Sequence, residues 1–185
     1  MNKILITVLF LSTFLCFSQE KNSENWTINE QAQYKKLTEL ANYINNKEKS
    51  QISKDSLFIK YIYFDYVLKD TVNERKERRL ATFDTIFYYF RKTLDSIGLK
   101  KLDAKPIRFY KNHKIYEPFD EEKAMESVNK EKMYSKDKNV FAYFTKEDPD
   151  SPLGALLFEP NSNKLAAWIM LNQGGYKYFL TFNLF

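Results

Sequence analysis

Residues 140–184 have the sequence VFAYFTKEDPDSPLGALLFEPNSNKLAAWIMLNQGGYKYFLTFNL, and they place the strongest constraint on the fold of this chain. Four runs in this stretch are rich in aliphatic and aromatic residues, as β-strands are: 140–145, 153–159, 164–171 and 176–184. Sequences rich in Pro, Asn, Asp and Gly separate these runs at 148–152, 160–163 and 173–175. Because such connections are short and sequential, the pattern predicts an antiparallel meander of four strands.

The alternation within these runs assigns their side chains to two faces, because alternate residues of a strand point the same way. A two-residue turn at Asn161-Ser162, and another at either Gln173-Gly174 or Gly174-Gly175, gives the same parity. One face is then uniformly large and apolar, and it holds Leu156, Phe158, Leu165, Ala167, Ile169, Leu171, Tyr176, Tyr178, Leu180 and Phe182. We expect this face to be the core that the helices cover.

The opposite face is unusually apolar for a surface that meets water. It collects Ala155, Leu157, Ala166, Trp168, Met170 and Phe179, with Lys177 and Thr181 toward one end. Two interpretations stay open: another helix or loop of the chain covers this face, or it is an exposed patch for self-association or a partner. On the second interpretation, the candidate partner- or ligand-binding residues are Leu157, Trp168, Met170 and Phe179.

Upstream of the strands the apolar residues recur at helical spacing. Two capping-box patterns, each a threonine followed three residues later by a glutamate, mark helix starts: Thr27 with Glu30, and Thr71 with Glu74. The first predicts a helix over residues 29–46. The second predicts a long helix that ends at Gly98, a residue type favoured just past a helix C-terminus.

Three other segments complete the sequence-based prediction. Residues 57–68 fit a helix with Ser53 or Asp55 as its N-cap, but their aromatic residues also suit a strand, so the choice stays open. Residues 107–115 predict a hairpin around a polar turn, because apolar side chains flank four polar ones. Asp120 can cap a short helix that runs to about Lys130.

The order of these elements is helices, hairpin, short helix and four-strand antiparallel meander, which predicts the α+β class. This order resembles, at the level of architecture, the NTF2-like or cystatin-like α+β roll. The resemblance implies helices that pack into a curved sheet, and it adds weight to a homodimer formed through the sheet.

The first residues have the pattern of a secretory signal peptide. Lys3 provides a positive start, residues 4–17 form an apolar run of 14 residues, and the small Ser18 precedes polar sequence at Gln19. The run is shorter than the roughly 20 residues that a spanning helix needs. We therefore expect residues 1–18 to be cleaved, residues 19–185 to form a single domain, and the protein to be periplasmic or secreted and not membrane-spanning.

Cysteine content and charge narrow the class of protein further. The only cysteine, Cys16, lies in the expected signal peptide, so the exported domain is disulfide-free and is held together by packing. Lipid anchoring through Cys16 is an alternative, although the bulky Leu15 before it disfavours the narrow cleavage site. Without Lys3 the balance is 28 basic to 24 acidic residues, a mild excess that does not indicate a nucleic-acid binder. The 16 Phe and 13 Tyr, with only 4 Gly, indicate a packed globular domain.

The sequence contains few residues with which to build a catalytic site. His113 is the only histidine and no cysteine remains after cleavage, so a histidine-rich metal site or a thiol nucleophile is excluded, and no cofactor is predicted. Asp65 and Asp84 interrupt aromatic-rich helical stretches. A carboxylate desolvated in that way has a raised pKa and can act as a general base. The more ordinary interpretation puts both on the solvated side of their helices.

Two classes of function follow. The first is an exported bacterial binding or interaction domain without catalysis, whose partner is an envelope or extracellular protein or a small apolar ligand. The second is a small enzyme that uses Asp65 or Asp84 in an aromatic pocket. The absence of a nucleophile–base pair or a metal-ligand set in the sequence favours the first.

Overall fold

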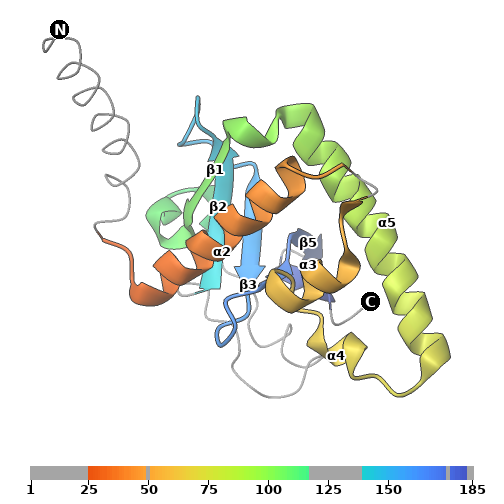
Figure 1. Ribbon diagram of the computed structural model, residues 1–185. Coiled ribbons are helices and arrows are strands. Elements are labelled where there is room, and N and C mark those ends of the chain that lie inside the picture. The colour runs from red at the N-terminus through yellow and green to blue at the C-terminus, as the bar shows by residue number, and fades with distance from the viewer. Residues whose placement is uncertain (1–24, 49–50, 117–138, 174–175, 183–185) are drawn as a thin grey trace, which may run out of the picture.

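The computed structural model describes residues 25–48, 51–116, 139–173 and 176–182, and the structural statements below concern these residues. The predicted α+β class is confirmed, because helices precede an antiparallel four-stranded sheet (Figure 1). In chain order the helices and strands are α2 (Ile28–Asn45), α3 (Lys54–Lys60), α4 (Asp65–Leu68), α5 (Asn73–Ile97), η3 (Leu99–Lys101), β1 (Leu102–Pro106), η4 (Ile107–Tyr110), η5 (Lys114–Tyr116), β2 (Val140–Thr145), β3 (Gly154–Phe158), β4 (Leu165–Ala167), β5 (Ile169–Gln173) and β6 (Tyr176–Leu180), where η denotes a 3-10 helix. The expected signal peptide, with Cys16, lies outside the described residues.

Helix α2 begins at the predicted capping box. The Thr27 hydroxyl accepts a hydrogen bond from the Glu30 N–H at 3.2 Å, and the Glu30 carboxylate accepts one from the Thr27 N–H at 2.6 Å. These two bonds satisfy N–H groups that the first turn of a helix leaves unpaired. Leu40 and Ile44 then bury the inner side of α2 in the core.

The segment 57–68, which fitted either a helix or a strand, contains two short helices with a break between them. Ser53 caps α3 as predicted, since its hydroxyl accepts a hydrogen bond from the backbone of the first turn. The break arises at β4: Leu165 accepts a backbone hydrogen bond from Tyr63 and donates one to Tyr61, each at 2.8 Å. One continuous helix is excluded, because these peptide groups cannot also bond within a helix.

The start of α5 differs from the prediction, and its end agrees with it. The predicted capping box at Thr71 is wrong, since Val72 is the N-cap and makes no side-chain cap bond. The Asp70 carboxylate instead accepts a hydrogen bond from the Val72 N–H at 3.0 Å. Gly98 follows the helix with φ 89°, a backbone conformation that L-residues with a side chain rarely adopt, which confirms it as the C-cap.

The predicted hairpin at residues 107–115 is wrong. The chain forms β1 just before this segment and then two 3-10 turns, η4 and η5. Local hydrogen bonds explain the difference: His113 N–H donates to the Tyr110 carbonyl at 2.8 Å, and Ile115 N–H donates to His113 Nδ1 at 3.0 Å. N–H groups held in this way are not available to a strand ladder. The short helix expected over residues 120–130 lies outside the described residues.

The sheet has four antiparallel strands in the order β1-β2-β3-β4, and β5 and β6 form a separate two-stranded sheet. Strand β2 has the predicted bounds, whereas the predicted run 164–171 divides at Trp168 into β4 and β5. In the two-stranded sheet Leu171 pairs with Tyr178, and Gln173 with Tyr176. The larger sheet thus contains four strands, but its fourth strand is β1, which pairs with β2, whereas β6, from the last predicted run, pairs with β5 in the separate sheet.

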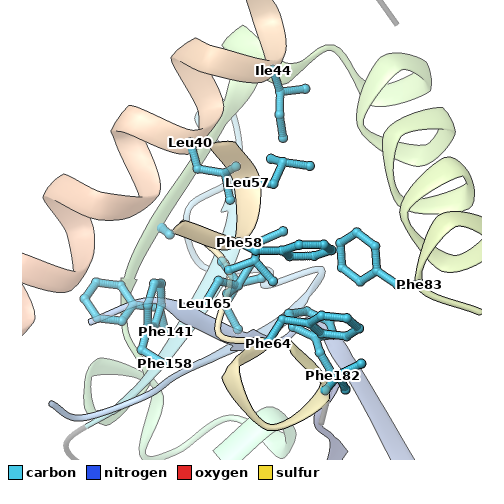
Figure 2. Close-up of a cluster of buried hydrophobic side chains, with 14 residues drawn as sticks. Leu40, Ile44, Leu57, Phe58, Phe64, Phe83, Phe141, Phe158, Leu165 and Phe182 are labelled. Atoms are coloured by element: carbon cyan, nitrogen blue, oxygen red, sulfur yellow. The ribbon is translucent and has the colours of Figure 1, made fainter. Parts of the chain in front are cut away.

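One face of the sheet packs against α2, α3 and α5 around a cluster of phenylalanines (Figure 2). Phe58 and Phe64 stack with ring centroids 4.6 Å apart, and Phe83 from α5 meets Phe58 edge-on at 4.9 Å. Phe158 and Leu165 lie opposite each other on β3 and β4 and join this cluster, as predicted. Full burial of each such side chain contributes about 1.5–3 kcal/mol, so this cluster is the main source of stability.

The second face of the sheet is also covered by the chain itself. Ala155, Leu157 and Ala166 are buried, and they form one cluster with Ile107 and Tyr110 from η4. At these three residues the structure agrees with the interpretation in which another segment of the chain covers the apolar second face. The covering segment is the region of η4 and η5, for which the sequence had predicted a hairpin.

Candidate functional site

Both candidate carboxylates lie at the surface beside lysines. The Asp84 side chain is 47% exposed, and its oxygen lies 2.5 Å from Lys54 Nζ. The Asp65 side chain is 38% exposed, and Lys164 Nζ lies 3.4 Å from it. Neither carboxylate has the desolvated environment that the general-base hypothesis requires. Their positions agree with the more ordinary interpretation of solvated, charge-paired residues.

The four predicted patch residues do not form one exposed patch. Leu157 is buried in the second-face cluster at 2% exposure, and Met170 and Phe179 are partly buried against that cluster. Trp168 lies at the break between β4 and β5, and its side chain packs against the phenylalanine cluster on the first face of the sheet. There it stacks on Phe90, with ring centroids 4.1 Å apart. The parity argument failed here because it assumed an unbroken strand.

Within the described residues, no three His, Cys, Asp or Glu side chains gather closely enough to hold a metal ion. None of the helices in this part of the chain combines the length and apolarity required to cross a membrane.

A cleft of about 370 Å³ opens where the C-terminal ends of α2 and α5 meet η3. Figure 1 shows these two helix ends converging at the top of the molecule, away from the α4 end of α5. The positive φ of Gly98 turns the chain sharply after α5, so that η3 lies beside the last turns of that helix. Ile44 and Leu99 supply apolar lining, and Asn45 adds an exposed amide.

The charged residues of the cleft are mostly basic. Among the described lining residues, Arg91, Lys100 and Lys101 are basic, and Asp95 is the one carboxylate. Among the described residues, none of these four side chains forms an ion pair.

Helix dipoles offset only part of this positive charge. The C-terminal ends of α2 and α5 each carry about half a negative charge. The side chains carry a net charge of two, so the cleft keeps an excess of about one positive charge. That excess favours an anionic ligand over a cationic one.

The guanidinium of Arg91 is the least satisfied polar group in the cleft. Its Nε and Nη1 atoms are buried and have no hydrogen-bond partner within the part of the chain that the structure describes. A buried donor left unpaired costs about 1–3 kcal/mol, and more when it is charged, so such groups are rare in folded proteins. The arrangement suits a site in which a ligand supplies the missing acceptor.

Pattern analysis of the sequence overlooked this residue, although a signal was present. Arg91 is four residues after Phe87 and three before Leu94, so it lies on the stripe of α5 that faces the core. A charged side chain in an apolar stripe requires a partner or a function. The lysines of η3 gave no such signal, because their approach to Arg91 depends on the turn at Gly98.

Comparison with other proteins gives no information about a ligand for this cleft, so its geometry is the guide. Searches of protein-family models, curated proteins and solved structures found no match to the chain.

Proposed function

We propose that this chain is an exported, non-catalytic domain that binds a small ligand in the cleft between α2, α5 and η3. The observation that carries the proposal concerns Arg91, whose Nε and Nη1 atoms are buried without a hydrogen-bond partner among the described residues, in a cleft with excess positive charge. The volume of about 370 Å³ is at the lower end of the range for small-molecule sites. Periplasmic or secreted location rests on residues 1–18, which have the composition of a signal peptide.

The enzyme alternative has less support. General-base chemistry at neutral pH needs a carboxylate whose pKa is raised by burial. Asp65 and Asp84 are instead exposed by more than a third and lie beside lysines. Neither lines the cleft, where Asp95, an exposed residue, is the only carboxylate among the described lining residues.

The first test concerns export. The full chain is expressed in a bacterial host, and the intact mass of the protein is measured in the periplasmic and extracellular fractions. We expect loss of the mass of residues 1–18 and a new N-terminus at Gln19. A chain that stays full-length in the cytoplasm would contradict the export part of the proposal.

The second test separates binding from catalysis. A fragment library is screened against the processed protein by ligand-observed NMR, and each hit is recovered after prolonged incubation and weighed by mass spectrometry. We expect hits that bind saturably, return unchanged, and bind equally well to the Asp65→Asn and Asp84→Asn variants. Conversion of a hit that depends on either aspartate would instead establish the enzyme.

A further inference from the structure

We infer that the ligand of this cleft carries an oxyanion, a carboxylate or a phosphate, next to a short apolar portion, and that Arg91 binds the oxyanion. This inference rests on the proposed function and adds the chemical class of the ligand.

The charges of the cleft support an oxyanion. Arg91, Lys100 and Lys101 form no ion pair with any described carboxylate. The other buried or half-buried arginines do form ion pairs with carboxylates. Arg108, for example, holds both oxygens of Glu30, at 2.7 and 3.0 Å. A guanidinium is built for this two-point contact, which is stronger than a neutral hydrogen bond. A ligand oxyanion would accept the same two-point contact from Arg91 that the Glu30 carboxylate accepts from Arg108.

The position of the guanidinium sets a requirement on binding. Water does not reach Nε and Nη1 of Arg91 in the present arrangement. The side chain must therefore rotate toward the cleft when a ligand enters. Such a rotation lets two unpaired donors gain an acceptor, so the rearrangement and the new contact act in the same direction.

The other lining residues limit the rest of the ligand. Ile44 is buried and Leu99 half-buried, so together they offer apolar surface to a short aliphatic or aromatic group. Asp95 would repel a second anionic group. The predicted ligand is thus a small amphiphile with a single anionic group, and a purely apolar ligand is disfavoured.

The experiment uses matched probes on the processed protein. Hexanoate and 1-hexanol share an alkyl chain and differ in charge, whereas acetate keeps the charge and loses the chain. Binding is followed by ¹H–¹⁵N NMR, including the Nε–H signal of Arg91, and by calorimetry. We expect hexanoate to bind about tenfold or more tightly than hexanol, as a charged hydrogen bond implies, and acetate to bind more weakly than hexanoate.

Hexyl phosphate distinguishes the two oxyanions. If it binds more tightly than hexanoate, the natural ligand carries a phosphate; if it binds more weakly, the ligand carries a carboxylate. Inorganic phosphate should compete with either probe, since it has the oxyanion without the alkyl chain.

The variants Arg91→Met, Arg91→Lys and Lys92→Met identify the residue responsible. Lys92 is the matched control, because it is the next residue of α5, is exposed and does not line the cleft. We expect Arg91→Met to weaken hexanoate binding about tenfold or more and Arg91→Lys to weaken it less, because a lysine keeps the charge without the fork. Lys92→Met should bind as the unmodified protein does. A thermal scan of each variant shows that it is folded.

The outcomes separate the two proposals. If hexanol binds as tightly as hexanoate, or Arg91→Met binds hexanoate normally, the oxyanion inference is overturned while the binding function stands. If none of these probes binds, the inference fails as well, and the fragment screen decides whether the cleft binds any ligand. If that screen also finds no compound that shifts signals of the cleft, the proposed function fails too.

Discussion

The arginines at the two ends of helix α5 differ in whether they have a carboxylate partner. At the N-terminal end, Arg75 and Arg79 converge on the carboxylate of Asp70, whose side chain is only 4% exposed. At the C-terminal end, Arg91 has two buried nitrogen atoms without a hydrogen-bond partner and lines a cleft. The first arrangement satisfies the charges within the chain. The second leaves a charge available, which is what a binding site needs and what a purely structural site avoids.

Arg108 shows how an arginine on this protein behaves when the contact is structural and well buried. Its guanidinium bonds both oxygens of Glu30, a carboxylate that is 2% exposed, and also donates to the Asn25 carbonyl. Burial acts to raise the pKa of Glu30, but the bonds from Arg108 and Thr27 together with the Arg108 charge lower it on balance. Replacing the paired and the unpaired arginines by the same residue therefore tests the comparison directly.

The largest effect is expected for Arg108→Met. The substitution leaves the Glu30 carboxylate buried without its cation, a change that costs 3–5 kcal/mol in a fully buried pair. Because Arg108 is itself 27% exposed, we expect a loss of about 2–3 kcal/mol in the free energy of unfolding. Urea denaturation measures it, with the exposed Lys111→Met as the control for removal of a nearby charge. A loss no larger than that of the control would remove Arg108 from the set of structural arginines.

The next effect is expected for Gly98→Ala, which alters the C-terminal end of α5. An added Cβ would meet only the Lys101 side chain at 3.7 Å, an ordinary contact, so the cost comes from the positive φ. We expect a loss of about 1–2 kcal/mol, as for other residues forced into such a conformation. Urea denaturation against Ser96→Ala in the same turn gives the comparison. If stability is unchanged, the turn that brings η3 to the cleft does not depend on glycine.

Arg91→Met should have the opposite sign to Arg108→Met. It removes buried donors that have no partner, so we expect the free energy of unfolding to rise by about 1 kcal/mol without ligand. In a domain of this size that corresponds to about 2–4 °C in the thermal midpoint. The exposed Lys92→Met should leave the midpoint where it is. A fall in stability would mean that Arg91 has a structural partner, and the contrast between the two ends of α5 would disappear.

The smallest effect concerns acid. Hydrogen bonds from Arg75 and from the Val72 N–H lower the pKa of Asp70 from 3.8 to about 2. The contribution of Asp70 to stability is therefore complete above pH 3.8, and it is lost as the pH falls toward 2. Between pH 5 and pH 3, Asp70→Asn should lose less stability than the unmodified protein. Asp150→Asn, at a side chain that is 95% exposed, should follow the unmodified protein. Equal acid sensitivity of all three would show that the Arg75 contact is weak in solution.

Local patterns in the sequence predicted the fold where short-range interactions decide it. The capping box at Thr27, the glycine after α5 and the bounds of β2 were all predicted. The sequence left the conformation of residues 57–68 open, and it is decided by the backbone hydrogen bonds that β4 makes at residues 61–63. The prediction failed at Trp168, where a strand ends early. In the cleft, Arg91 could have been suspected as a charge on an apolar stripe, but its neighbours in η3 could not.

The sequence by itself determined the α+β class and the dense aromatic content from which the core is built. Helical and strand periodicities, caps and turn residues are local properties, so they can be predicted from the sequence. Only the tertiary structure decided that the 3-10 segment covers part of the second face and that Asp65 and Asp84 lie beside lysines. It also decided that Nε and Nη1 of Arg91 have no hydrogen-bond partner among the described residues. Whether a charged group has an ion-pair or hydrogen-bond partner depends on residues that are distant in the sequence. Local sequence patterns do not predict such contacts.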